Sequence, residues 1–64
     1  MSEIVTKEQS EAFRKEVFLA LVEAQDQSMT VPQSRKEISQ RFGITEAETV
    51  RIEREGLDNN WPPL

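Results

Sequence analysis

The stretch that decides the fold is residues 34–56, which read SRKEISQRFGITEAETVRIEREG. Residues 34–37 and 45–48 both fit the capping box, in which a Ser or Thr and a Glu three residues later satisfy each other's backbone amides at a helix start. Gly43 lies between the two boxes, at a position typical of a helix end. The stretch therefore predicts two helices joined by a turn of three or four residues, which is the helix-turn-helix pattern.

The sequence also predicts where the second helix of this motif ends and how the two helices pack. We expect its second helix to run over residues 46–55, and Gly56 to close it in the left-handed conformation. Leu57 would then return to contact Ile52, as in a Schellman motif. Apolar side chains are spaced to fill the angle between the two helices, namely Ile38, Phe42, Ile44 and Ile52.

A longer helix is predicted upstream, over about residues 7–25, with a third capping box at residues 6–9. Residues 26–33 have no periodicity, and Pro32 disfavours helical backbone at Val31, so we expect a loop that lays Met29 and Val31 over the core. The helix before this loop has a broad apolar face at helical spacing, formed by Phe13, Val17, Phe18, Ala20, Leu21, Val22 and Ala24.

Length and composition limit the chain to one small domain. Sixteen of its 64 residues are Leu, Ile, Val or Phe, which exceeds the roughly one-fifth below which chains stay disordered. We therefore expect a single all-α domain of three helices that contains a helix-turn-helix and ends in an ordered tail over residues 57–64. The chain has no Cys and no His, and it is too short to enclose a substrate, so we expect neither an enzyme nor a metal or cofactor site.

The longest apolar stretch, residues 17–22, is far below the ~20 residues that cross a bilayer. The first residues form neither a basic leader nor an apolar signal sequence, which predicts a cytoplasmic location without membrane contact.

Residues 37–53, EISQRFGITEAETVRIE, resemble the helix-turn-helix of region 4 in sigma-70-family RNA polymerase subunits. That family shows Glu-Ile, a short helix ending in Leu-Gly or Phe-Gly, Val-Ser or Val-Thr, a basic recognition segment and Gln-Ile-Glu. The resemblance extends over about residues 34–57. It implies a transcription-associated protein that lays its second motif helix in the major groove of DNA.

Charge separates this chain from that family. The positions at which the family carries arginines are Glu46, Glu48 and Val50 here, and the two carboxylates also suit a helix start. The net charge of the chain is −4, whereas DNA-binding proteins usually present a basic surface. The candidates for DNA contact are Ser34, Arg35, Lys36, Arg41, Thr49, Arg51 and Arg54.

The alternative function is a protein-interaction module that keeps the same fold. It would bind a partner, such as a component of the transcription machinery, through its acidic first helix and through Trp61 and Leu64 of the tail. Trp61 has two interpretations: it folds back over Val50 and closes the core, or it forms an exposed hook held by the two following prolines. A homodimer would strengthen weak DNA binding by avidity, although the sequence shows no dimer interface.

Overall fold

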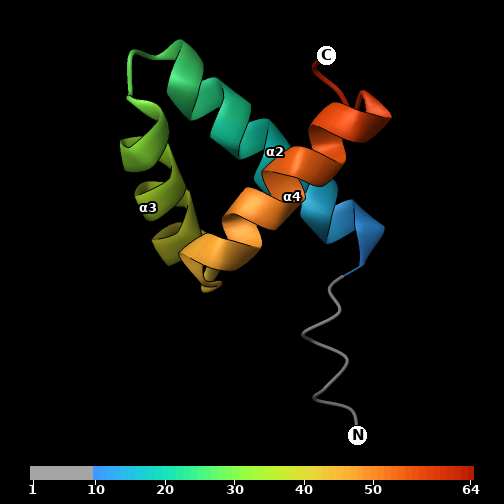
Figure 1. The fold of residues 1–64 in the computed structure, drawn as a ribbon, viewed down its shortest axis with the longest axis horizontal. Helices are drawn as coiled ribbons and strands as arrows, with labels where there is room; N and C mark the ends of the chain where they lie inside the picture. The colour runs from blue at the N-terminus through green and yellow to red at the C-terminus, as the bar shows by residue number, and fades with distance from the viewer. Residues whose placement is uncertain (1–9) are drawn as a thin grey trace, which may run out of the picture.

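The computed structural model describes residues 10–64, which form three helices and no strand (Figure 1). The helices are α2 (Glu11–Asp26), α3 (Val31–Phe42) and α4 (Glu46–Asn59). Each helix contacts the other two, and α4 returns from the end of α3 to cross α2 (Figure 1). The all-α prediction is confirmed. No helix within residues 10–64 is long and apolar enough to span a membrane.

The core is built mainly on the apolar face of α2, as its spacing predicts. Val17, Phe18 and Leu21 are fully buried, and they meet Ile38 of α3 and Ile52 of α4. Further apolar residues, which are half-buried, pack around this cluster: Phe13, Ala20, Val22, Ala24, Phe42 and Ile44. Among them, the rings of Phe13 and Phe42 pack edge to face with centroids 5.7 Å apart, which joins the start of α2 to the end of α3.

The start of α2 is set by Ser10, whose side-chain oxygen accepts a hydrogen bond from the Phe13 amide at 3.1 Å. The described helix therefore begins at Glu11 rather than at residue 7. The capping box predicted at residues 6–9 lies outside the described residues.

The prediction of a loop over residues 26–33 is wrong in its second half, because α3 begins at Val31. Thr30 caps this helix: it accepts from the Gln33 amide at 3.2 Å, and the Gln33 side chain accepts from the Thr30 amide at 3.2 Å. Pro32 lies in the first turn, where a helix does not require the amide hydrogen that proline lacks. Val31 is consequently an exposed first-turn residue and does not cover the core.

The turn after α3 matches the prediction at both ends. Gly43 closes α3 with φ 70°, a backbone conformation that glycine adopts without steric cost, and Thr45 caps α4 through the predicted box with Glu48. Three residues, 43–45, separate the two helices. Ile44 is half-buried against the core, and its amide donates to the Ser39 carbonyl at 3.0 Å, so the connection is tied to both helix and core.

The predicted end of α4 at Gly56 is wrong, because the helix continues to Asn59 and closes at Asn60, with φ 52°. Gly56 is buried where α4 crosses α2, and a Cβ atom built there would lie 2.3 Å from Cδ1 of Phe18. The glycine is thus used for close approach of two helices. Leu57 is exposed, and so it does not make the buried return contact expected of it.

Trp61 belongs to the core, as the first of its two interpretations proposes. It is only 6% exposed and packs edge to face on Phe18, with ring centroids 6.2 Å apart, while its amide donates to the Gly56 carbonyl at 3.0 Å. Arg14 and Lys15 lie over its ring at 6.0 and 5.8 Å. Val50, which Trp61 was expected to cover, instead lines a hollow on the outer side of α4.

Candidate functional site

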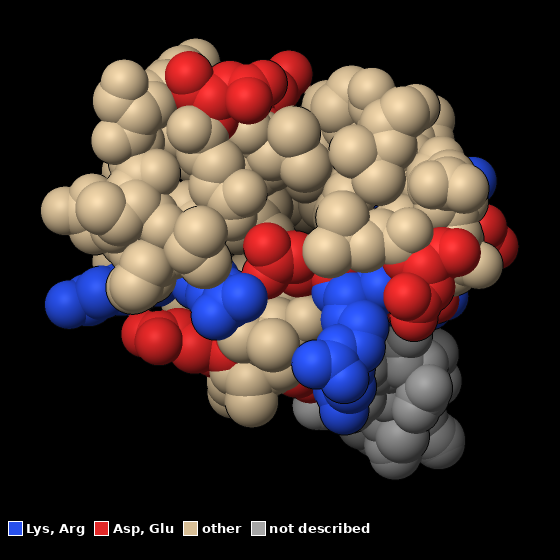
Figure 2. All heavy atoms as spheres, turned by 45° about the horizontal axis from the view of Figure 1, so that its top comes forward, with Lys and Arg blue, Asp and Glu red and all other residues tan. Residues whose placement is uncertain are grey.

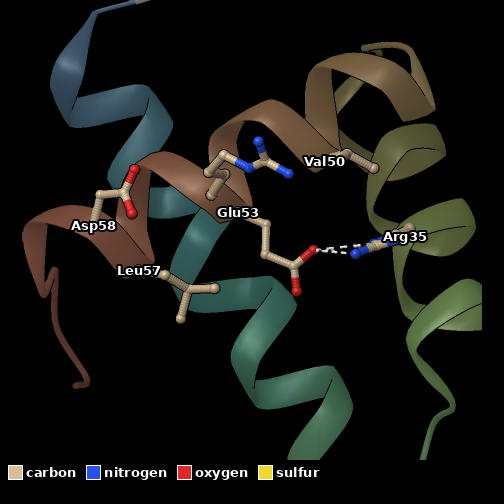
Figure 3. Close-up of a pocket in the computed structure, with 6 residues that line it drawn as sticks. Arg35, Val50, Glu53, Leu57 and Asp58 are labelled. Atoms are coloured by element: carbon tan, nitrogen blue, oxygen red, sulfur yellow. Dashed lines mark hydrogen bonds and ion pairs between the residues drawn. The ribbon is translucent and has the colours of Figure 1, made fainter.

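Ser34 and Arg35, two of the predicted DNA contacts, belong to a polar network that joins all three helices. Ser34 is fully buried; its hydroxyl donates to the Val31 carbonyl at 2.8 Å and accepts from the Gln25 side chain at 3.1 Å. Arg35 forms an ion pair with Glu53 of α4, with N–O distances of 3.0 and 2.8 Å (Figure 3). Gln25 also donates to Glu53, at 3.4 Å. Ser34 is therefore unavailable to a phosphate, and the charge of Arg35 is offset within the fold.

This network predicts a measurable coupling between Arg35 and Glu53. Each single replacement by alanine is expected to destabilise the domain by about 1 kcal/mol, because both groups are only partly exposed and each would leave its partner unpaired. The double replacement should cost about as much as either single one, which a double-mutant cycle by urea unfolding would measure. Strictly additive effects would show that the pair contributes nothing.

Thr49, a third predicted contact, is also inside the fold. It is fully buried, and its hydroxyl donates to the Thr45 carbonyl one turn earlier at 3.0 Å. Helical spacing places it on the same side of α4 as Ile52 and Gly56, which are buried as well. This assignment to the DNA surface is corrected, since the side chain is buried inside the fold and is not exposed to solvent.

The outer side of α4 is the surface that stays open. Arg51 has 76% of its side chain exposed, and its nearest carboxylate, that of Glu48, is 4.0 Å away. Arg54 is exposed one turn further along. A hollow of about 540 Å³ lies beside it, between α4 and α3 (Figure 3), lined by Arg35, Val50, Glu53, Arg54, Leu57 and Asp58. We call the group formed by half-buried Val50 and by the exposed residues Arg51, Arg54 and Leu57 the α4 outer face.

Lys36 and Arg41 do not join this surface. Arg41 lies over the ring of Phe42 at 5.7 Å and lines hollows on the side of α2. Lys36 lines another hollow, together with Met29, near the start of α3. Of the seven residues predicted to contact DNA, only Arg51 and Arg54 are exposed together on one helix face.

Charge on the three helices is mixed. By sequence, α4 holds two arginines and five carboxylates, whereas α3 holds three cations and one carboxylate. In Figure 2 the basic side chains in view lie mainly in one band, interleaved with acidic ones, and a further acidic group lies apart from this band at the top; the face has no continuous basic patch. Glu48 acts at the helix start, where it accepts from the Thr45 amide at 3.2 Å. Helix capping therefore accounts for the carboxylate at this position, without a contact to a DNA base.

Sequence reasoning missed Gln25 and Glu53, the two side chains that fix Ser34 and Arg35. No local signal marks them, because their partners lie 9 to 28 residues away in the sequence. Leu64, the second residue of the alternative site, is 58% exposed at the end of the tail, whereas buried Trp61 cannot act as the exposed hook.

Within residues 10–64, no three His, Cys, Asp or Glu side chains group together as metal ligands would. Comparisons of the chain with protein-family models, with curated proteins and with solved structures find no match.

Proposed function

We propose that the chain is a small helix-turn-helix domain in which α3 and α4 form the motif and the α4 outer face contacts duplex DNA. The observation that carries the proposal is the exposure of Arg51 and Arg54 on the helix that follows a three-residue turn. α2 packs behind both helices and leaves this face open, as a recognition helix requires. The resemblance of residues 34–57 to a sigma-70 region 4 motif supports the same assignment of roles.

The residue types on this face suit contact with base edges and phosphates. An arginine side chain can donate two hydrogen bonds to O6 and N7 of guanine, and an apolar side chain such as Val50 can contact the methyl group of thymine. Arg51 and Arg54 are three residues apart, about 4.5 Å along the helix axis, so they lie close enough to serve adjacent positions of one site. We assign Arg51 to a base edge, because it is nearer the start of α4, and Arg54 to a phosphate.

Because α4 holds more carboxylates than arginines, we expect weak binding to DNA. Each phosphate contact contributes about −0.9 to the slope of log K against log salt concentration. With two to four cations available, the slope should be about −2 to −4, which is low for a DNA-binding protein. Affinity should therefore be weak for one copy and should rise where two copies bind one site.

A binding experiment with matched arginine variants tests the proposal. Fluorescence anisotropy with a labelled mixed-sequence duplex at about 20 mM salt should show binding that is lost as salt rises. Arg51→Ala and Arg54→Ala should each weaken it about tenfold. Arg41→Ala is the control, because it removes the same charge from a different surface, and it should change Kd by less than about twofold. Absence of binding at low salt, or equal losses in all three variants, would contradict the proposal.

A further inference from the structure

A second surface lies between α2 and α3, on residues that DNA contact by α4 does not use. Two hollows of about 410 and 280 Å³ share Ala20, Glu23 and Arg41 in their linings, so they lie side by side. The lining adds residues from α2, from α3 and from the connection between them, and none from α4: Glu16, Leu19, Ala24, Gln27, Met29, Glu37, Ile38 and Phe42. We call this surface the α2–α3 groove.

Apolar side chains form part of the floor of the α2–α3 groove, in the hollow of about 410 Å³. Leu19 is 39% exposed on the outer side of α2, and the half-buried side chains of Ala20 and Phe42 lie beside it in the same hollow. Glu16, Ala20 and Glu23 follow one another at helical spacing, so one strip of α2 presents carboxylates and apolar atoms together. The groove thus offers an apolar spot formed by Leu19, Ala20 and Phe42, with a glutamate of α2 on each side of it.

The rim of the groove carries unbalanced negative charge. Glu16, Glu23 and Glu37 are exposed, and none of them has an ion-pair partner within residues 10–64, whereas Glu53 and Glu55 are each paired with an arginine. Arg41 is the single cation in the lining, so the charges sum to −2. Glutamates without an ion-pair partner among the described residues, placed around the apolar spot of Leu19, Ala20 and Phe42, are complementary to a ligand that is apolar on one side and basic on its edges.

We propose that the α2–α3 groove binds a basic amphipathic helix from a protein partner. Apolar side chains of that helix would enter between Leu19 and Phe42, as in other helix-in-groove complexes, while its lysines and arginines face Glu16, Glu23 and Glu37. Duplex DNA is excluded as the occupant, since its phosphates would meet these carboxylates. The groove and the α4 outer face share no residue, so this binding does not depend on DNA contact.

Two synthetic helical peptides of equal length test this proposal on the full chain. One is built from Leu and Lys, the other from the same Leu positions with Glu in place of Lys. In an amide-resolved NMR titration at about 100 mM salt, the Leu-Lys peptide should shift residues 16–24 and 37–42, and the Leu-Glu peptide should shift nothing. Equal shifts with both peptides, or shifts confined to α4, would overturn the proposal.

Matched variants then separate groove binding from general attraction to an acidic protein. Glu16→Gln combined with Glu23→Gln should weaken binding of the Leu-Lys peptide about fivefold, because two exposed ion pairs are lost. Leu19→Ser should weaken it by a similar factor. Asp26→Asn, which removes a carboxylate from α2 outside the groove, and Leu57→Ser on the α4 outer face are the controls and should have less than a twofold effect. All of these side chains are exposed, so the fold is retained; equal affinity across the set would overturn the proposal.

Discussion

Replacing Gly56 by alanine should destabilise the domain by about 2–3 kcal/mol, although alanine normally favours a helix by about 1 kcal/mol over glycine. The added Cβ would lie 2.3 Å from Cδ1 and 2.6 Å from Cγ of Phe18. The Phe18 ring is fully buried and packs against Trp61, so it cannot move aside without disturbing the core. Thermal unfolding followed by circular dichroism should show a loss of Tm of about 10 °C or more.

Two further variants identify the cause of this loss. Phe18→Leu removes the ring that meets the new Cβ, so the Gly56→Ala/Phe18→Leu protein should be more stable than the sum of the two single effects indicates. Gly43→Ala is the matched control: a Cβ atom built at this position meets nothing within 4 Å, and the φ of +70° alone should cost about 1 kcal/mol, with no relief from Phe18→Leu. Native stability of Gly56→Ala would disprove the close crossing of α2 and α4.

Trp61→Ala should be the most damaging single change in the tail, at about 3–5 kcal/mol. A chain of this length has a total stability of only about 3–10 kcal/mol, so a large part of the variant should be unfolded at 37 °C. The reason is that Trp61 covers Phe18 and lies beneath Arg14 and Lys15, so its removal opens the core to water. Urea unfolding gives the measurement.

Leu64→Ala serves as the control for this change, because Leu64 is an exposed apolar residue of the same tail. Its effect should stay within about 0.5 kcal/mol. Trp61→Phe should recover part of the loss by restoring an aromatic contact with Phe18. If Trp61→Ala kept native stability, the tail would not be part of the core.

The parts of the fold that can be predicted from the sequence are those determined by residues close together in the chain. The apolar face of α2, the cap at Thr45 and the helix end at Gly43 depend on residues within one or two turns, and all three agree with the structure. The predicted start of α3 at the capping box of residues 34–37 is wrong, because the box that forms is that of residues 30–33, which fits the same pattern. Ser34 does not cap the helix, because it is buried and accepts a hydrogen bond from Gln25 of α2.

The end of α4 could not be predicted from the local sequence either. Gly56 and Asn60 can both adopt left-handed backbone, so the local pattern does not decide between them. The helix continues past Gly56 because this glycine lets α4 approach Phe18, a contact 38 residues away in the sequence. In the candidate site, periodicity alone supports the exposure of Arg51 and Arg54. The pairing of Arg35 with Glu53 is tertiary and has no local signal.

The measurement that tests the central claim most directly is an amide-resolved NMR titration of the labelled chain with a mixed-sequence DNA duplex at low salt. DNA contact by the α4 outer face predicts shifts over residues 43–54, together with the side-chain Nε–H signals of Arg51 and Arg54, all vanishing as salt rises. Shifts confined to the α2–α3 groove, or a well-dispersed spectrum that the duplex leaves unchanged, would contradict it.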